Sequence, residues 1–472
     1  MKNNRRDFLK MGGLTAIGLT SSLSPAEAGD AAQAQIDQLM KDPKQTFNMS
    51  GYAAPKIDTV RIGFIGLGNR GSGAITRVNR IANVQTVAIC DIRPAKIANA
   101  LKALKKMDIE PITYTEKEEA WKEMCQRPDI DLIYIATPWH LHTPMAVYAM
   151  QHGKHVACEV PAATTLEECW QLVETSEKTK KHFMMLENCC YDFFELLTLN
   201  MARQGYFGEL LHVEGAYIHD LLDANFKQDQ YYDNWRLKAN MRNGNLYPTH
   251  GLGPICQLLN VNRGDQMDYL VSIQSDDFSM QKKALELSVK DPYFKQFVDQ
   301  KFRGNMNTTT IKTHHGKTIM VQHDVSSPRP YSRIHLLSGT NGVAMKYPEP
   351  RISNHHHEWI KPEQMAEMEK KYAPPIVAKI GELAKQIGGH GGMDFMMDWR
   401  LIDCLRNGLP LDQDVYDAAA WSAIVPLSEV SVNNRSRSMN VPDFTRGSWK
   451  TNAPVDISLN QGANTGVKPA KV

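Results

Sequence analysis

Two patterns of hydrophobic and polar residues divide the chain. Between residues 58 and 189, nearly continuous apolar runs (TVRIGFIGL, VQTVAICD, DLIYIATP, HVACEVP and HFMMLEN, with a shorter strand expected at PITYT) alternate with amphipathic stretches of helical spacing. Apolar strands separated by amphipathic helices are typical of a parallel sheet that helices cover on both faces. The pattern predicts an α/β domain with a doubly wound parallel sheet over residues 58–189.

From residue 190 to residue 472 the pattern changes. The segments LLHVEGAYIH, LVSIQSDD, TTTIKTHHGKTIMVQHDV and RIHLLSGTNGVAMKY alternate apolar and polar residues, as strands of a half-solvated antiparallel sheet do. Near the C-terminus, one helical stripe ends at Gly408 and Pro410, and DVYDAAAWSAIVPLSEVSV predicts a second helix that Pro426 kinks or splits. We expect an α+β domain with an open, mainly antiparallel sheet that binds the substrate.

The N-terminus has the features of an export signal. Arg5 and Arg6 precede Asp-Phe-Leu-Lys, a short apolar stretch follows, and Ala26-Glu27-Ala28 has the small-x-small pattern of a cleavage site. Residues 1–28 resemble a twin-arginine signal peptide, although a basic disordered N-terminus is the simpler alternative. We expect export to the periplasm, with the polar residues 29–57 forming a loosely held arm before the first domain.

Charge and cysteine usage narrow the class of protein. The formal net charge is +2, and residues 1–28 account for it, with four basic against two acidic residues. A neutral body argues against nucleic acid or an anionic membrane surface as partner. No apolar run reaches the roughly 18 residues of a membrane span. The eight cysteines form no CxxC pair and several lie in apolar runs, which favours buried thiols over a disulfide framework.

A glycine-rich motif opens the first domain. Gly66-x-Gly68-x-x-Gly71 follows the first strand and starts a helix, and Asp91 ends the second strand 20 residues after Gly71. In this setting the glycines allow a tight turn and close approach to a pyrophosphate, and the acidic residue binds ribose hydroxyls. The motif predicts a Rossmann domain that binds NAD in preference to NADP, with Arg93 close enough to keep NADP open.

Polar residues follow three further strands of the predicted parallel sheet. Ligands lie outside the carboxyl ends of such strands, so these residues are expected to line the nicotinamide end of the cofactor site: Trp139, His140, Leu141, His142, Glu159, Val160 and Asn188.

Several motifs together resemble a known family. GLGNRG, WHLH, CEVP, ENCCYDF, NWR, YPTH and GGHGGMD resemble glycoside hydrolase family 109, the NAD-dependent α-N-acetylgalactosaminidases, within the glucose-fructose oxidoreductase and inositol dehydrogenase superfamily. Typical dehydrogenases of the superfamily carry Glu-Lys-Pro where this chain has Glu159-Val160-Pro161. Val160 has no titratable group, which speaks against simple alcohol dehydrogenation and agrees with family 109.

The resemblance implies a set of binding residues. Those implied to contact NAD are Asn69, Arg70, Asp91, residues 139–142, Glu159, Val160, Asn188 and Tyr247. Those implied to line the sugar site are Tyr217, Arg236, Tyr247, Pro248, Thr249, His250 and, from the segment RPYSR, Tyr331.

The resemblance also implies a chemistry that leaves the cofactor unchanged. NAD⁺ takes hydride from carbon 3 of a terminal α-linked N-acetylgalactosamine, the aglycone leaves by elimination, water adds, and the hydride returns with retention of configuration. Tightly bound NAD, recycled in each turnover, would serve an exported enzyme. His250, Tyr247 and Tyr191 are the candidates for acid and base, and their individual roles stay open.

Other interpretations remain at this point. His355–His357 suggest a metal, but no further ligand at suitable spacing completes a site, so a surface loop and no metal are expected. The runner-up function is a periplasmic NAD(P)-dependent sugar oxidoreductase with captive cofactor. A third is a sugar- or nucleotide-binding protein on a former dehydrogenase scaffold. An open sheet in the second domain is compatible with a homo-oligomer.

Overall fold

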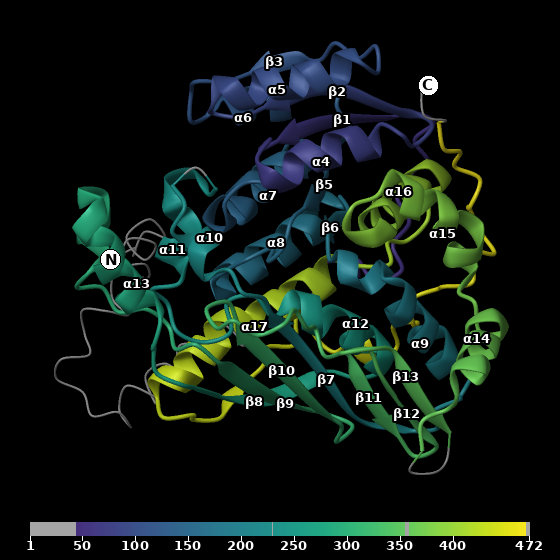
Figure 1. The fold of residues 1–472 in the computed structure, drawn as a ribbon. Coiled ribbons are helices and arrows are strands. Elements are labelled where there is room, and N and C mark those ends of the chain that lie inside the picture. Colours follow the sequence, from purple (N-terminus) through teal and green to yellow (C-terminus); the bar gives the residue numbers. More distant parts are fainter. Residues whose placement is uncertain (1–43, 229, 355–357, 469–472) are drawn as a thin grey trace, which may run out of the picture.

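The structure, a computed structural model, describes residues 44–228, 230–354 and 358–468. Two sheets form its main layers (Figure 1). Helices α12 (Thr249–Leu259) and α17 (Val415–Asn433) lie between them: α12 packs against the larger sheet and α17 contacts both. The predicted export signal, the start of the predicted arm and His355–His357 lie outside the described residues.

The first sheet has six parallel strands in the order β3-β2-β1-β4-β5-β6. They are β1 (Val60–Ile65), β2 (Val84–Cys90), β3 (Ile112–Tyr114), β4 (Leu132–Ile135), β5 (His155–Cys158) and β6 (Phe183–Met185), joined by α4 (Asn69–Val78), α5 (Pro94–Lys105), α6 (Ala120–Cys125), α7 (His142–Gln151) and α8 (Leu166–Thr179). The strand order reverses between β1 and β4, which opens a crevice at their carboxyl ends. The predicted Rossmann sheet is confirmed.

Local sequence explains these elements. Every residue of β4 and β5 is buried, as the continuous apolar runs predict. Helix α8 begins at a capping box, in which the Thr165 side chain accepts from the Glu168 amide and the Glu168 side chain accepts in return.

The second sheet has eight strands in the order β13-β12-β11-β7-β10-β9-β8-β14. They are β7 (Leu210–Ile218), β8 (Met267–Gln274), β9 (Asn307–Thr313), β10 (Thr318–Asp324), β11 (Leu336–Gly339), β12 (Gly342–Met345), β13 (Arg351–Asn354) and β14 (Met439–Asn440). Only the pairing of β7 with β10 is parallel. The odd positions of β9 are buried and the even ones more open, which confirms the predicted half-solvated, mainly antiparallel sheet.

The remaining helices include several that the sequence pattern did not single out. The α-helices are α9 (Phe193–Arg203), α10 (Leu222–Asn225), α11 (Trp235–Ala239), α13 (Met280–Lys290), α14 (Pro362–Lys371), α15 (Pro375–Ile387) and α16 (Met393–Asn407). The 3₁₀ turns are η1 (Trp139–Leu141), η2 (Asn188–Tyr191), η3 (Tyr232–Asn234), η4 (Pro292–Phe297), η5 (His390–Gly392) and η6 (Ser448–Lys450).

The two predicted C-terminal helices are present. Helix α16 ends at Gly408 in the left-handed region, as expected. Helix α17 runs through Pro426 as one helix, so of the two expected effects the split is wrong, and a kink stays a prediction. Packing against α8 on one side and β8 on the other holds α17 as one helix, despite the missing proline amide.

Segments from both ends of the described chain return to the Rossmann domain. Helix α16 packs against α4 and β1, and Val467 bridges to Ile81. Residues 44–57 dock closely, with Met49 and Ala54 buried, so the described part of the expected arm is held more firmly than predicted. The cofactor-binding half is therefore completed by residues from the far end of the sequence.

All eight cysteines are buried and unpaired, as their apolar surroundings predict. Among the described residues, no helix is long and apolar enough to cross a membrane.

Candidate active site

A cavity of about 550 Å³ lies in the crevice at the carboxyl ends of β1, β4 and β5. Residues of the glycine-rich turn, of η1 and Tyr247 all line it. Most of the predicted cofactor-binding residues line it: Gly66, Gly68, Asn69, Arg70, Asp91, Trp139, His140, Leu141, His142, Glu159, Val160 and Tyr247. Arg236, predicted for the sugar site, lines it as well.

The glycine-rich turn has the shape that a dinucleotide requires. Gly66 has φ +87°, and a Cβ on Gly71 would lie 1.8 Å from the Gly66 carbonyl oxygen, so both positions exclude a side chain. A Cβ on Gly68 would meet only the tip of Arg93, at 3.4 Å, because it would point into the cavity. This cradle fits a pyrophosphate approaching the backbone at Gly68.

Asp91 organises the same turn. Its carboxylate accepts from the amides of Leu67 at 2.8 Å and Arg93 at 2.9 Å, and it also pairs with the Arg93 guanidinium. A carboxylate fixed at this point is suited to ribose hydroxyls.

The inner end of the cavity is aromatic and contains a buried cation. The Trp139 and Tyr247 rings stack at 5.5 Å, and the Arg236 guanidinium lies 5.2 Å from the Trp139 ring and 5.1 Å from the Tyr247 ring. Tyr231 and Trp235 also face this guanidinium. In the described part of the chain, no carboxylate lies within ion-pair distance of Arg236, so its charge is available to a ligand.

The predicted sugar-binding side chains gather beside Tyr247. The ring of Tyr217 lies 4.7 Å from that of Tyr247, 5.3 Å from His250 and 6.3 Å from Tyr331. The Tyr217 hydroxyl also lies 3.0 Å from Nδ1 of His219. An aromatic surface of this kind, with polar tips, suits the apolar faces and hydroxyl groups of a sugar ring.

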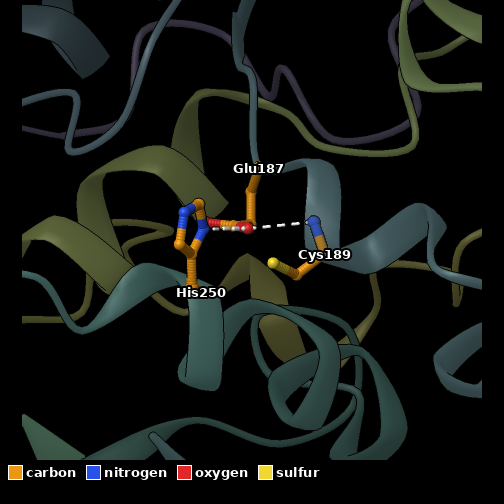
Figure 2. A group of neighbouring side chains, drawn as sticks. All are labelled: Glu187, Cys189 and His250. Carbon is orange, nitrogen blue, oxygen red and sulfur yellow. Dashed lines mark hydrogen bonds and ion pairs between the residues drawn. The ribbon is translucent and has the colours of Figure 1, made fainter. Parts of the chain in front are cut away.

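His250 is held by a buried carboxylate. Figure 2 shows Glu187 and His250 facing each other, with Nδ1 of His250 2.7 Å from Oε1 of Glu187. Burial would raise the pKa of Glu187, but the neighbouring His250 imidazole and the Cys189 amide hold it below its usual value. An ionised carboxylate only accepts hydrogen bonds, so Nδ1 carries a proton, and in the neutral imidazole Nε2 is then the acceptor.

Cys189 completes a group whose ligand atoms lie within 4.8 Å of one another, close enough for a metal ion. Burial raises the pKa of the Cys189 thiol well above its usual value, so the thiol stays protonated. The Glu187 oxygen in the group already accepts from His250 and from the Cys189 amide. These contacts favour a carboxylate–histidine pair over a metal centre.

Tyr247 is a protonated phenol in this setting. Burial and the neighbouring Tyr217 raise its pKa well above the usual value, and Arg236 offsets this only in part. Without a further positive charge, Tyr247 can donate a proton but is a poor base.

Other predicted residues lie outside the cavity. Gly71 packs inside the turn, and Asn188 is buried and donates to Asp394. Pro248 and Thr249 are buried at the start of α12, where they place His250. Tyr191 is buried with its hydroxyl 3.2 Å from Asp412, so its geometry does not favour the role of base.

Sequence reasoning did not assign Glu187, Trp235 or Asp394 to the site. All three stood within motifs already singled out, ENCCYDF, NWR and GGHGGMD. The signal that could have identified Glu187 is its position: like Asn188, it is a polar residue just after β6.

Comparisons with known proteins agree with this geometry. The family model "Glycosyl hydrolase 109, C-terminal domain" matches residues 191–451, and "Oxidoreductase family, NAD-binding Rossmann fold" matches residues 60–187. A glycosyl hydrolase family 109 protein of Shewanella pealeana is 46% identical over 97% of this chain and 99% of its own. A Bacteroides fragilis protein named alpha-N-acetylgalactosaminidase is 50% identical over 87% of this chain and 97% of its own.

Solved structures share the fold at low identity. Levoglucosan dehydrogenase in complex with NADH is 17% identical, with 82% of this chain and all of its own covered and a TM-score of 0.58. An NAD binding oxidoreductase from Klebsiella pneumoniae is 16% identical, with 81% and 99% covered and a TM-score of 0.60. On the family matches and the full-length relatives, the chain belongs to glycosyl hydrolase family 109 and is a glycoside hydrolase built on an NAD-binding Rossmann domain.

Proposed function

We propose that this glycoside hydrolase removes terminal α-linked N-acetylgalactosamine from glycans, with retention of configuration, by transient oxidation of the sugar. The observation that carries the proposal is the position of the Glu187–His250 pair. The His250 ring of this pair lies beside two tyrosines. Tyr247 lines the cofactor cavity, and Tyr217 belongs to the predicted sugar-binding side chains. The name of the Bacteroides fragilis relative supports the choice of sugar.

The cofactor would supply the redox chemistry of the reaction, and the side chains would supply the proton transfers. NAD⁺, when bound, supplies reversible removal of hydride from carbon 3, so that the neighbouring carbon 2 hydrogen becomes acidic and the cofactor is restored at the end of each turnover. Gly68, Arg70, Asp91 and Val160 border the space in which it would be held.

His250 has the arrangement of a general base. Glu187 fixes the protonated Nδ1 and stabilises the imidazolium that forms, so Nε2 can take a proton from the sugar. Tyr247, a protonated phenol 4.8 Å from His250 between ring centroids, would donate a proton to the departing aglycone oxygen. When water adds to carbon 1, the Tyr247 phenolate takes a proton from the water and His250 returns a proton to carbon 2, which restores both side chains.

Arg236 can stabilise the negative charge that develops when carbon 2 loses its proton. It is buried, it is free of carboxylate partners among the described residues, and it faces Tyr217 and Tyr247. Val160 places an apolar, non-titrating side chain where the superfamily's dehydrogenases have lysine. The proton of the carbon 3 hydroxyl must therefore pass to another group, and we assign it to His250, which would release it to solvent before taking the carbon 2 proton.

We further propose that NAD is bound tightly, that the protein acquires it before export through the twin-arginine-type signal, and that it acts in the periplasm. A cofactor that each turnover restores needs no nicotinamide pool outside the cytoplasm. The eight buried free thiols fit folding in a reducing compartment before export.

The test uses protein purified without added cofactor and chromogenic aryl glycosides. Release is expected from the α-N-acetylgalactosaminide, with the α-galactoside and the β-anomer as controls for the acetamido group and the anomer. Absence of release from all three, even with NAD⁺ supplied, would favour the sugar oxidoreductase instead.

A further inference from the structure

The segment GGHGGMD, which joins α15 to α16, reaches across to the cofactor motif. Gly388, Gly389, Gly391 and Gly392 all have positive φ, and this tight turn brings the start of α16 against α4. Figure 1 shows α16 beside α4 of the Rossmann domain. The first turn of α16 carries Asp394, which is almost completely buried.

Asp394 connects residues from separate strand ends of the Rossmann sheet. Its Oδ2 accepts from Arg70, which follows β1, at 3.1 Å, and its Oδ1 accepts from Asn188, which follows β6. Arg70 in turn donates to Glu159, which follows β5, at 2.8 Å. His390 lies at the open side of this network, with Nδ1 2.9 Å from Asp394 Oδ2.

The turn is shaped for this contact. A Cβ on Gly389 would lie 2.7 Å from Cβ of Asp394 and 3.1 Å from Cδ of Arg77, so a side chain at this position would displace the carboxylate. Burial opposes the charge on Asp394, but His390, Arg70 and Arg77 around it hold its pKa well below the usual value. The carboxylate is therefore ionised and its hydrogen bonds are charge-assisted.

Asp394 is not needed simply to attach α16. One helical turn further on, Asp398 pairs with Arg77 of α4 at 2.6 Å and accepts from the Tyr134 hydroxyl of β4. That second pair anchors the helix without contacting Arg70, Glu159 or Asn188.

We propose that Asp394 is a positioning residue for cofactor retention. By fixing Arg70 and Asn188, and Glu159 through Arg70, it keeps the rim of the cofactor cavity closed and slows the release of NAD, with His390 completing the closure. The inference rests on the proposed function because it assumes that NAD stays bound between turnovers. It assigns this retention to the turn between α15 and α16.

The test compares Asp394→Asn with Asp398→Asn as a matched control on the same helix. Each protein is purified without added cofactor, bound NAD(H) is released by denaturation and quantified, and the rate of NAD loss is followed under dilution. Loss of charge-assisted hydrogen bonds predicts roughly tenfold faster release from Asp394→Asn. Asp398→Asn is expected to lower the melting temperature while it keeps its NAD.

Equal retention by Asp394→Asn and wild type would overturn the inference, as would equal loss from both variants, which indicates a merely structural role. If Asp394→Asn does not fold, His390→Ala, with an exposed side chain, decides: it must release NAD faster than wild type. Wild-type protein that contains no NAD would refute the captive cofactor separately. The inference is then tested on the Kd of added NAD⁺, which Asp394→Asn must raise.

Discussion

The proposed proton transfer by His250 depends on one buried carboxylate. Glu187 is ionised, because its neighbours lower its pKa despite burial, and it faces Nδ1 of His250 at 2.7 Å. A negative neighbour stabilises the imidazolium that forms when the imidazole takes up a proton. Removing that charge must therefore slow a reaction in which His250 is the base.

The substitution Glu187→Gln tests this directly. It keeps the size and an acceptor for the Cys189 amide but removes the charge, and we expect kcat/KM for the α-N-acetylgalactosaminide to fall about 10²-fold or more. Glu214→Gln, which disrupts the carboxylate–histidine pair of Glu214 with His212 on β7, is the control and must leave kcat/KM unchanged. Wild-type kcat/KM in Glu187→Gln would exclude Glu187 as the partner that His250 needs.

A further prediction concerns the group of Glu187, Cys189 and His250, in which we expect no metal ion to act. Glu187, Cys189 and His250 satisfy one another, so prolonged treatment with EDTA should leave both aglycone release and bound NAD unchanged. Activity that is lost with chelator and restored by a divalent cation would show that the group is a metal site.

At the residue level, sheet topology predicted which side chains line the cavity, but it did not predict the hydrogen-bond partners of the site residues. The side chains after β1, β4 and β5 were predicted because parallel strands end at one edge of a sheet. Glu187 and His250 are 63 positions apart, and their pairing follows from the packing of α12 against η2, which no local pattern reports.

At the level of the element, two glycines of the glycine-rich turn have different tasks: Gly68 leaves space for the cofactor, and Gly71 allows the turn itself to fold. Gly68 has a negative φ of −73°, so it lies outside the left-handed region, and a side chain there would enter the cavity. We expect Gly68→Val to reduce bound NAD about tenfold or more while the protein still folds. Gly71→Ala forces a Cβ against the Gly66 carbonyl and should lower the melting temperature as well.

Both variants are measured by NAD content per protein and by thermal unfolding with and without added NAD⁺. Wild-type NAD content in Gly68→Val would mean that the cofactor does not pass over this turn.

Elements with buried faces were the most predictable. Strands such as β4, β5 and β9 carry a clear pattern because they have buried residues, whereas β3 has none and was expected only as a short strand. Helix α14 has no buried residue and α13 buries only Met280 and Ala284, so neither shows a clear apolar stripe. Helix α17 is enclosed between two layers, and this tertiary packing explains why Pro426 does not divide it.

At the scale of the whole molecule, segments from both the N-terminal and the C-terminal parts of the sequence build the cofactor-binding half. Helix α16 and Val467 pack on the Rossmann domain, so the order of residues along the chain could not reveal the spatial division. This arrangement is compatible with the proposal that the protein folds around its cofactor before export.

Export is tested with Arg5→Lys combined with Arg6→Lys. Because the paired arginines are the recognised feature of a twin-arginine signal, we expect the variant to stay in the cytoplasm, folded and with its NAD, while wild type reaches the periplasm. Cell fractionation with activity and NAD assays measures both. Equal export of the two proteins would remove the twin-arginine assignment.

The most direct test of the transient oxidation follows hydrogen at carbon 2 of the sugar. Protein purified without added cofactor is given a chromogenic α-N-acetylgalactosaminide in deuterated water, and the released sugar is analysed by NMR. If His250 removes the carbon 2 proton and exchanges it with solvent, aglycone release is accompanied by deuterium at carbon 2. Hydrolysis that leaves carbon 2 fully protonated, with a kinetic isotope effect absent for substrate deuterated at carbons 2 and 3, would contradict the redox mechanism.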